Sequence, residues 1–161
     1  MADDILIDCG DDYANGAVRS VLEDYLPPDV LGAFNGRLAL VSTSSMDGIR
    51  LTKSFCRDRD VIVLSERILP VKSGDEEFHP RYRYFIFVVL RELAHACKNH
   101  LSPSLDGLTV EEAAAQEREA SELAFEWFNE RASTTLFQPP LTPAEVDEFS
   151  KNARILRPGI G

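Results

Sequence analysis

The sequence predicts one α+β domain, in which a small three-stranded sheet, mainly antiparallel or mixed, packs on a buried central helix and a second, glutamate-bearing helix. The strand candidates, at 38–41, 49–56 and 61–64, are short, and 61–64 is made of β-branched residues and leucine between charged neighbours. The helix candidates follow at about 80–100 and 109–131, and both are too long for ordinary strands. A chain of 161 residues is enough for one sizeable core, so we expect a single domain over 1–161.

Charge and composition exclude several classes of protein. With 44% hydrophobic and 27% charged residues, the chain has the composition of an ordinary soluble globular protein. Seventeen basic and twenty-seven acidic residues give a net charge of −10, which argues against direct binding of nucleic acid. No basic run suggests a membrane surface, the start of the chain lacks a signal-peptide pattern, and no apolar run is long enough to span a bilayer. Three widely spaced cysteines favour reduced thiols, so we expect a cytoplasmic protein.

The N-terminal segment predicts an arm followed by an amphipathic helix. Residues 1–10 are predicted to form a loose or short extended arm. Asp11 or Asp12 can cap a helix that runs to about Tyr25. The apolar positions of this helix share one face: Ala14, Val18, Val21, Leu22 and Tyr25. Two prolines at 27–28 end it, and a short helical turn is expected at 29–34.

The central helix is predicted from about Pro80 to His100, because proline suits a first helical turn and the apolar run at 84–90 is continued by further helix-compatible residues. A second long helix begins after Thr109, which forms a capping-box pattern with Glu112. The same cap pattern recurs after the prolines at 139–140, with Thr142, Pro143 and Glu145. It predicts the start of a last short helix that ends near Ile155, within a C-terminal segment, 141–161.

Chemistry concentrates on the two long helices. The most apolar run of the chain, at 84–90, is followed by Arg91, Glu92 and His95. Residues three and four apart share a helix face, so all three side chains can border one pocket. Glu117 lies at helical spacing with small and apolar residues of its own helix, namely Ala113, Ala120, Ala124 and Phe128. A carboxylate on such a face needs a cation or a metal, unless it lies at the edge of the stripe and reaches water. Four other glutamates fall on an acidic face that looks solvated: Glu119, Glu122, Glu126 and Glu130.

These residues resemble the zincin metallopeptidases, most closely the ImmA/IrrE-like branch. The R-E-L-A-H stretch differs by one letter from the H-E-x-x-H motif, and the helix around Glu117 resembles the one that supplies a glutamate ligand in that branch. The resemblance spans about 38–131. It implies zinc as the cofactor, Glu92 as the general base, His95 and Glu117 as metal ligands, and Ser121 as a residue behind the ligands. It also implies that the strand at 61–64 is an edge strand that lines the cleft.

Arg91 stands where the first histidine ligand belongs, and a guanidinium has no lone pair for a cation. One interpretation is that its guanidinium fills the metal's place and pairs bidentately with Glu117, and also with Glu92. Another is that Arg91 extends to the surface and pairs with nothing. In a third, a different residue restores a zinc site, for which His79, on a loop, is better placed than Cys97 or His100, both of which turn off the face of His95.

Three functional hypotheses follow. In the first, the chain is a non-catalytic or inactivated zincin-fold domain that binds a regulatory protein or peptide partner, such as a transcriptional regulator. In the second, it is an active zinc metallopeptidase that uses Glu92 with His95, Glu117 and a non-standard further ligand. In the third, Arg91 is an inactivating replacement in an otherwise catalytic sequence. We prefer the first hypothesis, and we expect zinc to be absent or weakly bound. No G-x-S-x-G elbow, phosphate-binding loop or dinucleotide fingerprint is present to favour other enzyme classes.

Overall fold

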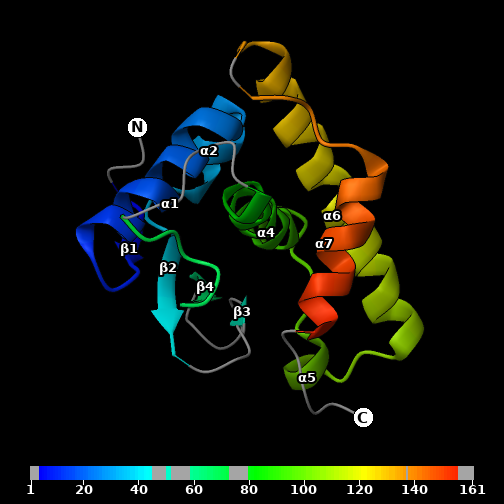
Figure 1. Cartoon of the computed structure of the whole chain (residues 1–161). Helices are drawn as coiled ribbons and strands as arrows, with labels where there is room; N and C mark the ends of the chain where they lie inside the picture. The colour runs from blue at the N-terminus through cyan, green and yellow to red at the C-terminus, as the bar shows by residue number, and fades with distance from the viewer. Residues whose placement is uncertain (1–3, 45–49, 52–58, 73–79, 137, 156–161) are drawn as a thin grey trace.

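The computed structural model describes residues 4–44, 50–51, 59–72, 80–136 and 138–155, and its fold is α+β (Figure 1). The helix α4, Pro80–Cys97, runs through the middle of the molecule. The sheet and the two N-terminal helices lie on one side of it, and the two C-terminal helices α6 and α7 lie on the other (Figure 1). The predicted arrangement of a sheet and a second long helix around a buried helix is therefore present.

The sheet has four strands in the described residues, in the order β1-β2-β4-β3. Strand β1 is Leu6–Asp8, β2 is Leu38–Thr43, β3 is Arg50–Leu51 and β4 is Asp60–Ser65. The strands β1, β2 and β4 are parallel, and only β3 runs antiparallel, against β4. Of the two expected arrangements, the mainly antiparallel one is therefore wrong and the mixed one is present, with four described strands in place of three. Two helices connect β1 to β2, and a crossover of this length brings consecutive strands into parallel alignment.

The first ten residues include a paired strand, which corresponds to the short extended form of the predicted arm. Leu6 pairs with Ala39 of β2, and the Gly36 amide donates to the Asp4 carbonyl over 3.1 Å. Of the predicted second strand at 49–56, Arg50–Leu51 is strand β3, and residues 49 and 52–56 lie outside the described residues.

Strand β4 contains the strand predicted at 61–64 but does not lie at the edge of the sheet. It pairs with β2 along its whole length on one side, and with β3 at Val61 and Ile62 on the other. The expectation that this strand forms the open edge is therefore wrong, and the edge on that side is β3. The apolar pattern of residues 61–64 could not reveal this, because an interior strand and an edge strand can bury the same face.

The N-terminal helices follow their sequence signals closely. Helix α1 is Asp12–Tyr25, and the Asp11 carboxylate caps it by accepting a 2.8 Å hydrogen bond from the Ala14 amide. Its buried residues include the whole predicted apolar face. Helix α2 is Pro28–Phe34 and buries Leu31 and Phe34.

The two long helices form the centre of the core. Every residue of α4 from Phe85 to Leu90 is at most 7% exposed, so this turn and a half is covered on all sides. Helix α6, Val110–Ser133, starts with the predicted capping box of Thr109 and Glu112, and packs Phe128 fully buried against this core. A short helix, α5, Pro103–Asp106, lies between α4 and α6 in the chain.

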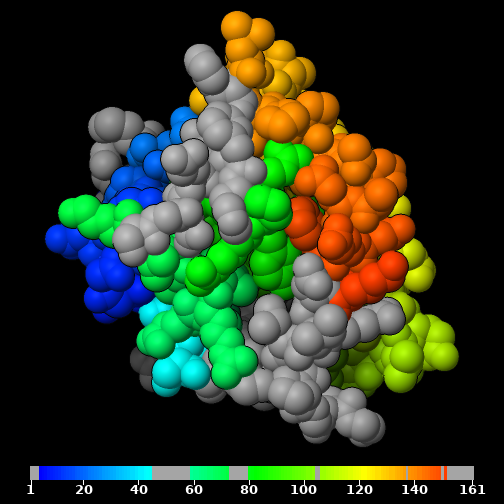
Figure 2. Space-filling view, viewed as in Figure 1, coloured from blue at the N-terminus to red at the C-terminus, as the bar shows by residue number. Residues whose placement is uncertain are grey.

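Helix α7, Pro143–Ile155, is fastened to α4 by a buried arginine. The Arg83 guanidinium donates to both carboxylate oxygens of Glu145, over 3.0 and 3.1 Å. It also donates to the carbonyl of Pro139 over 2.7 Å and to the side-chain oxygen of Gln138 over 3.2 Å. Figure 2 shows the orange-to-red side chains of α7 packed beside the green segment of α4.

None of the described helices combines the length and the apolar character needed to cross a bilayer.

Candidate functional site

Arg91, Glu92, His95 and Glu117 meet where α4 packs against α6, as the helix spacing predicts. Arg91 Nη2 lies 3.6 Å from Glu92 Oε1, and Arg91 Nε lies 4.0 Å from Glu117 Oε2. The other oxygen of Glu117 lies 3.3 Å from His95 Nε2. One carboxylate from α6 thus bridges the arginine and the histidine of α4, and we call these four residues the Arg91 cluster.

The pairing of Arg91 is looser than the expected bidentate fork. Its Nε–H is buried and has no hydrogen-bond partner among the described residues, since 4.0 Å to Glu117 is too long for a hydrogen bond. The Glu117 side chain is 52% exposed, whereas that of Arg91 is 12% exposed. Glu117 therefore lies at the edge of the apolar stripe of α6, and the covered partner of the pair is the cation rather than the carboxylate.

His95 is held on the side opposite Glu117 by a second histidine. The two Nδ1 atoms of His95 and His100 are 2.9 Å apart, and the rings meet edge to face with centroids 5.0 Å apart. Both histidines are buried, with 7% of each exposed. The expectation that His100 turns away from the face of His95 is therefore wrong.

His100 contacts His95 because α4 ends before His100 and the chain turns back. The helix stops at Cys97, and Asn99 adopts the left-handed backbone conformation with φ of 52°. Asparagine tolerates this region better than most residues and commonly ends helices in it. The chain then folds back, the His100 amide donates to the His95 carbonyl over 2.9 Å, and the His100 ring returns over the last turn. Asn99 is the residue in the sequence that indicates this helix end, whereas the prediction continued the helix to about His100.

Glu119 also belongs to the site, although its spacing on α6 indicated a solvated residue. Its carboxylate lies 3.0 Å from His100 Nε2, while its side chain stays 60% exposed. A continuous line of contacts therefore runs from Glu117 through His95 and His100 to Glu119. Sequence spacing could not reveal this partner, because the contact depends on how α6 packs against the turn after α4.

Whether His95 Nε2 carries a hydrogen determines whether it can donate a hydrogen bond to Glu117. If His100 donates from Nε2 to Glu119, its Nδ1 accepts from His95 Nδ1, and His95 Nε2 is left with a lone pair. With one further proton on the pair, His95 Nε2 also carries a hydrogen and donates toward Glu117. In the neutral arrangement, the hydrogen bond from His95 Nδ1 to His100 holds the His95 ring in place. Metal-binding histidines are oriented in the same way, by a hydrogen bond from the ring nitrogen that does not bind the metal.

The charge of Arg91 disfavours a metal ion within the cluster. Its guanidinium lies 3.6 Å from Glu92 and 4.0 Å from Glu117, and its positive charge opposes a nearby cation. Within the described part of the chain, no three histidine, cysteine, aspartate or glutamate side chains are grouped so that they could hold a metal ion. Cys97 faces a different pocket, and His79 lies outside the described residues. Ser121 is half-buried, one turn of α6 after Glu117.

Comparison with known proteins gives no further assignment. No family model, no curated protein and no solved structure matches the chain.

Proposed function

We propose that this chain is a relative of the zincin metallopeptidases in which Arg91 takes the place of the metal, and that it acts as a non-catalytic, regulatory protein-binding domain. The observation that carries the proposal is the Arg91 guanidinium, 12% exposed, held between the carboxylates of Glu92 and Glu117. The two carboxylates balance the charge of this covered cation, so the cluster is electrostatically satisfied without a metal ion.

A protein or peptide partner is the expected ligand, with a transcriptional regulator as the class that the resemblance favours. The arrangement of the sheet supports peptide binding, because the two-residue strand β3 ends the sheet antiparallel to β4. Such an edge offers backbone groups to an extended peptide, which can add to it as a further strand. Protein contact suits a chain of net charge −10 better than contact with nucleic acid.

Zinc titration of three proteins tests the proposal. Arg91→His places two imidazoles one helical turn apart, which with Glu117 makes a His₂Glu set plus water. Arg91→Gln is the matched control, because it removes the positive charge and supplies no imidazole. Calorimetry should show tight zinc binding by Arg91→His at neutral pH, and weak or no binding by the given sequence and by Arg91→Gln.

The outcomes separate the parts of the proposal. If the given sequence binds one zinc per chain with a Kd below about 1 μM, the non-catalytic assignment is wrong. If Arg91→His folds but gains no zinc affinity, the assignment of His95 and Glu117 as former ligands is wrong. If Arg91→His binds zinc and also cleaves an unfolded protein substrate, then Glu92 acts as the general base and Arg91 is an inactivating replacement.

A further inference from the structure

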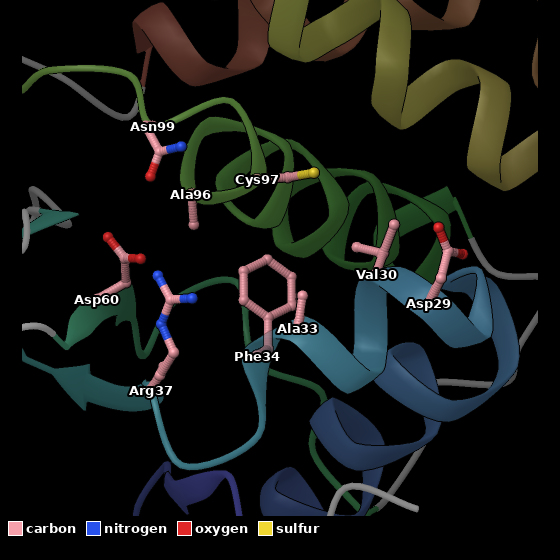
Figure 3. Close-up of a pocket in the computed structure, with 9 residues that line it drawn as sticks. All are labelled: Asp29, Val30, Ala33, Phe34, Arg37, Asp60, Ala96, Cys97 and Asn99. Carbon is pink, nitrogen blue, oxygen red and sulfur yellow. The ribbon is translucent and has the colours of Figure 1, made fainter.

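Two polar side chains of the pocket between α2 and the last turn of α4 are already engaged. The pocket has a volume of about 300 Å³, and Figure 3 shows Arg37, Asp60 and Asn99 at its polar end. Asp60 and Asn99 both interact with other residues of the chain. A buried donor that lacks a partner among the described residues is found instead in the Arg91 cluster.

The Arg91 guanidinium is 88% covered in its side chain's terms, yet it makes no hydrogen bond to a described residue: the side chain is only 12% exposed. Its Nη2 lies 3.6 Å from Glu92 Oε1 and its Nε lies 4.0 Å from Glu117 Oε2, and both distances are too long for hydrogen bonds. Nε is also fully buried. The charge of the cation is therefore balanced, whereas its N–H donors still lack acceptors.

Glu92 places an acceptor directly beside these donors. Its carboxylate makes no hydrogen bond to a described residue, and its side chain is 24% exposed. Arg91 and Glu92 thus present a charged donor and a charged acceptor next to each other, in a position that is covered but open at one side. Such a pair is complementary to a group that carries an acceptor and a donor on the same edge.

We propose that the Arg91–Glu92 pair binds the side-chain carboxamide of a glutamine or an asparagine in a peptide partner. The amide oxygen accepts from the terminal N–H groups of Arg91, and the amide NH₂ donates to the Glu92 carboxylate. The inference rests on the proposed function, because it names the group by which a peptide partner is recognised at the same cluster.

Other groups of a peptide satisfy this pair less well. A carboxylate would bring a further negative charge beside Glu92 and Glu117, and an ammonium has no acceptor for the Arg91 donors. A main chain carries substituents on both sides and needs an open edge, whereas the two side chains are only 12% and 24% exposed. A carboxamide at the tip of a side chain is narrow enough to reach them.

The ligand is tested by NMR titration of the full chain with blocked amino acids. N-acetyl-L-glutamine methylamide and its asparagine equivalent are titrated separately, and at least one should bind with a Kd below about 10 mM. The methionine and glutamate equivalents have similar length but lack the amide edge, so each should bind at least about tenfold more weakly. The Nε–H resonance of Arg91, identified by its loss in Arg91→Lys, should shift on binding.

Two variants with matched controls place the site. Arg91→Lys keeps the charge but loses the planar donor fork, and Glu92→Met loses the acceptor, so each should weaken binding at least about tenfold. Lys98→Arg, at an exposed site on α4, and Glu122→Met, at an exposed site on α6, are the controls and should bind as the given sequence does. Circular dichroism checks that each variant folds, and the blocked amino acids decide the question in the given sequence alone.

The outcomes separate this inference from the proposed function. Equal binding of the glutamine, asparagine and methionine probes means that the backbone makes the contact, and it overturns the inference. Acetamide that binds as tightly as the blocked residues overturns the assignment to a peptide. If no probe binds and the given sequence also binds no zinc, the inference alone is wrong, whereas tight zinc binding by the given sequence overturns the proposed function as well.

Discussion

The Nδ1 atoms of His95 and His100 lie 2.9 Å apart, although the chain leaves the helix between them. The contact exists because Asn99 takes up a left-handed conformation and turns His100 back onto the last turn of α4. Glu119 of α6 then holds the outer nitrogen of His100 over 3.0 Å. His95 is thus fixed from both sides, by a histidine–glutamate pair behind it and by Glu117 in front.

This arrangement predicts that His100 acts as a positioning residue in the zinc-binding variant. In the Arg91→His background, His100→Ala removes the acceptor that orients His95, so zinc affinity should fall about 10- to 100-fold. Glu119→Gln should act in the same direction, and Glu122→Gln, an exposed neighbour on α6, should have no effect. Zinc titration measures all three, and equal affinity with and without His100 would contradict the orientation.

Arg83 should contribute strongly to the stability of the fold. Arg83→Met leaves the carbonyl of Pro139 and the side-chain oxygen of Gln138 without their donor, and removes the partner of Glu145. Loss of these contacts should lower the free energy of unfolding by about 2–4 kcal/mol in urea denaturation. Arg118→Met, at an exposed site on α6, is the control and should change it by less than about 0.5 kcal/mol.

Glu145 should make stability depend on pH in the acid range. Partial burial alone would raise the pKa of Glu145, but hydrogen bonds from Arg83 and Thr142 and the charge of Arg83 outweigh it and hold the pKa below its usual value. A lowered folded-state pKa stabilises the fold above the unfolded value of about 4.3, and this stabilisation is lost as the pH falls through the folded value.

Glu145→Gln should therefore destabilise the protein at pH 7 and lose that effect progressively below about pH 4. Unfolding curves collected from neutral to acid pH measure the difference between the two proteins. A difference that stays constant across the titration would show that the carboxylate charge does not contribute.

Cys9 should be almost unreactive in the folded protein. Burial, with added repulsion from the carboxylates of Asp8 and Asp11, raises the pKa of Cys9 to about 11. At pH 8 its thiolate population is about 100-fold below that of an ordinary thiol, so iodoacetamide should modify it only when the chain unfolds. Peptide mapping after labelling, with and without guanidinium chloride, measures this.

The raised thiol pKa of Cys9 also has a consequence for stability. The protonated thiol favours the folded state below the unfolded value of about 8.5, and this contribution is lost as the pH rises through the folded value. Stability should therefore decline on the alkaline side, and Cys9→Ala should reduce that decline.

Most helix boundaries could be predicted because their signals are local. Asp11 caps α1, Thr109 and Glu112 form the capping box of α6, and Thr142 with Glu145 forms a second one before α7. These bonds join residues three positions apart, so the sequence contains both partners in one window. The meeting of Arg91, Glu92 and His95 was predictable for the same reason, since helical spacing alone brings them to one face.

The contacts that complete the site could not be predicted in this way. His100 reaches His95 only through the turn at Asn99, and Glu119 reaches His100 across nineteen positions of sequence. The interior place of β4 likewise depends on β3 pairing with its free side.

The sequence by itself determined where the long helices begin, which of their faces are apolar, and that Arg91, Glu92 and His95 share one helix face. Tertiary structure decided that three strands are parallel, that a histidine–glutamate pair stands behind His95, and that Arg37 and Asp60 share a pocket. The physical reason is the range of the interactions. Capping and helical periodicity act within about four residues, whereas strand order and side-chain pairs between elements depend on the packing of the whole core.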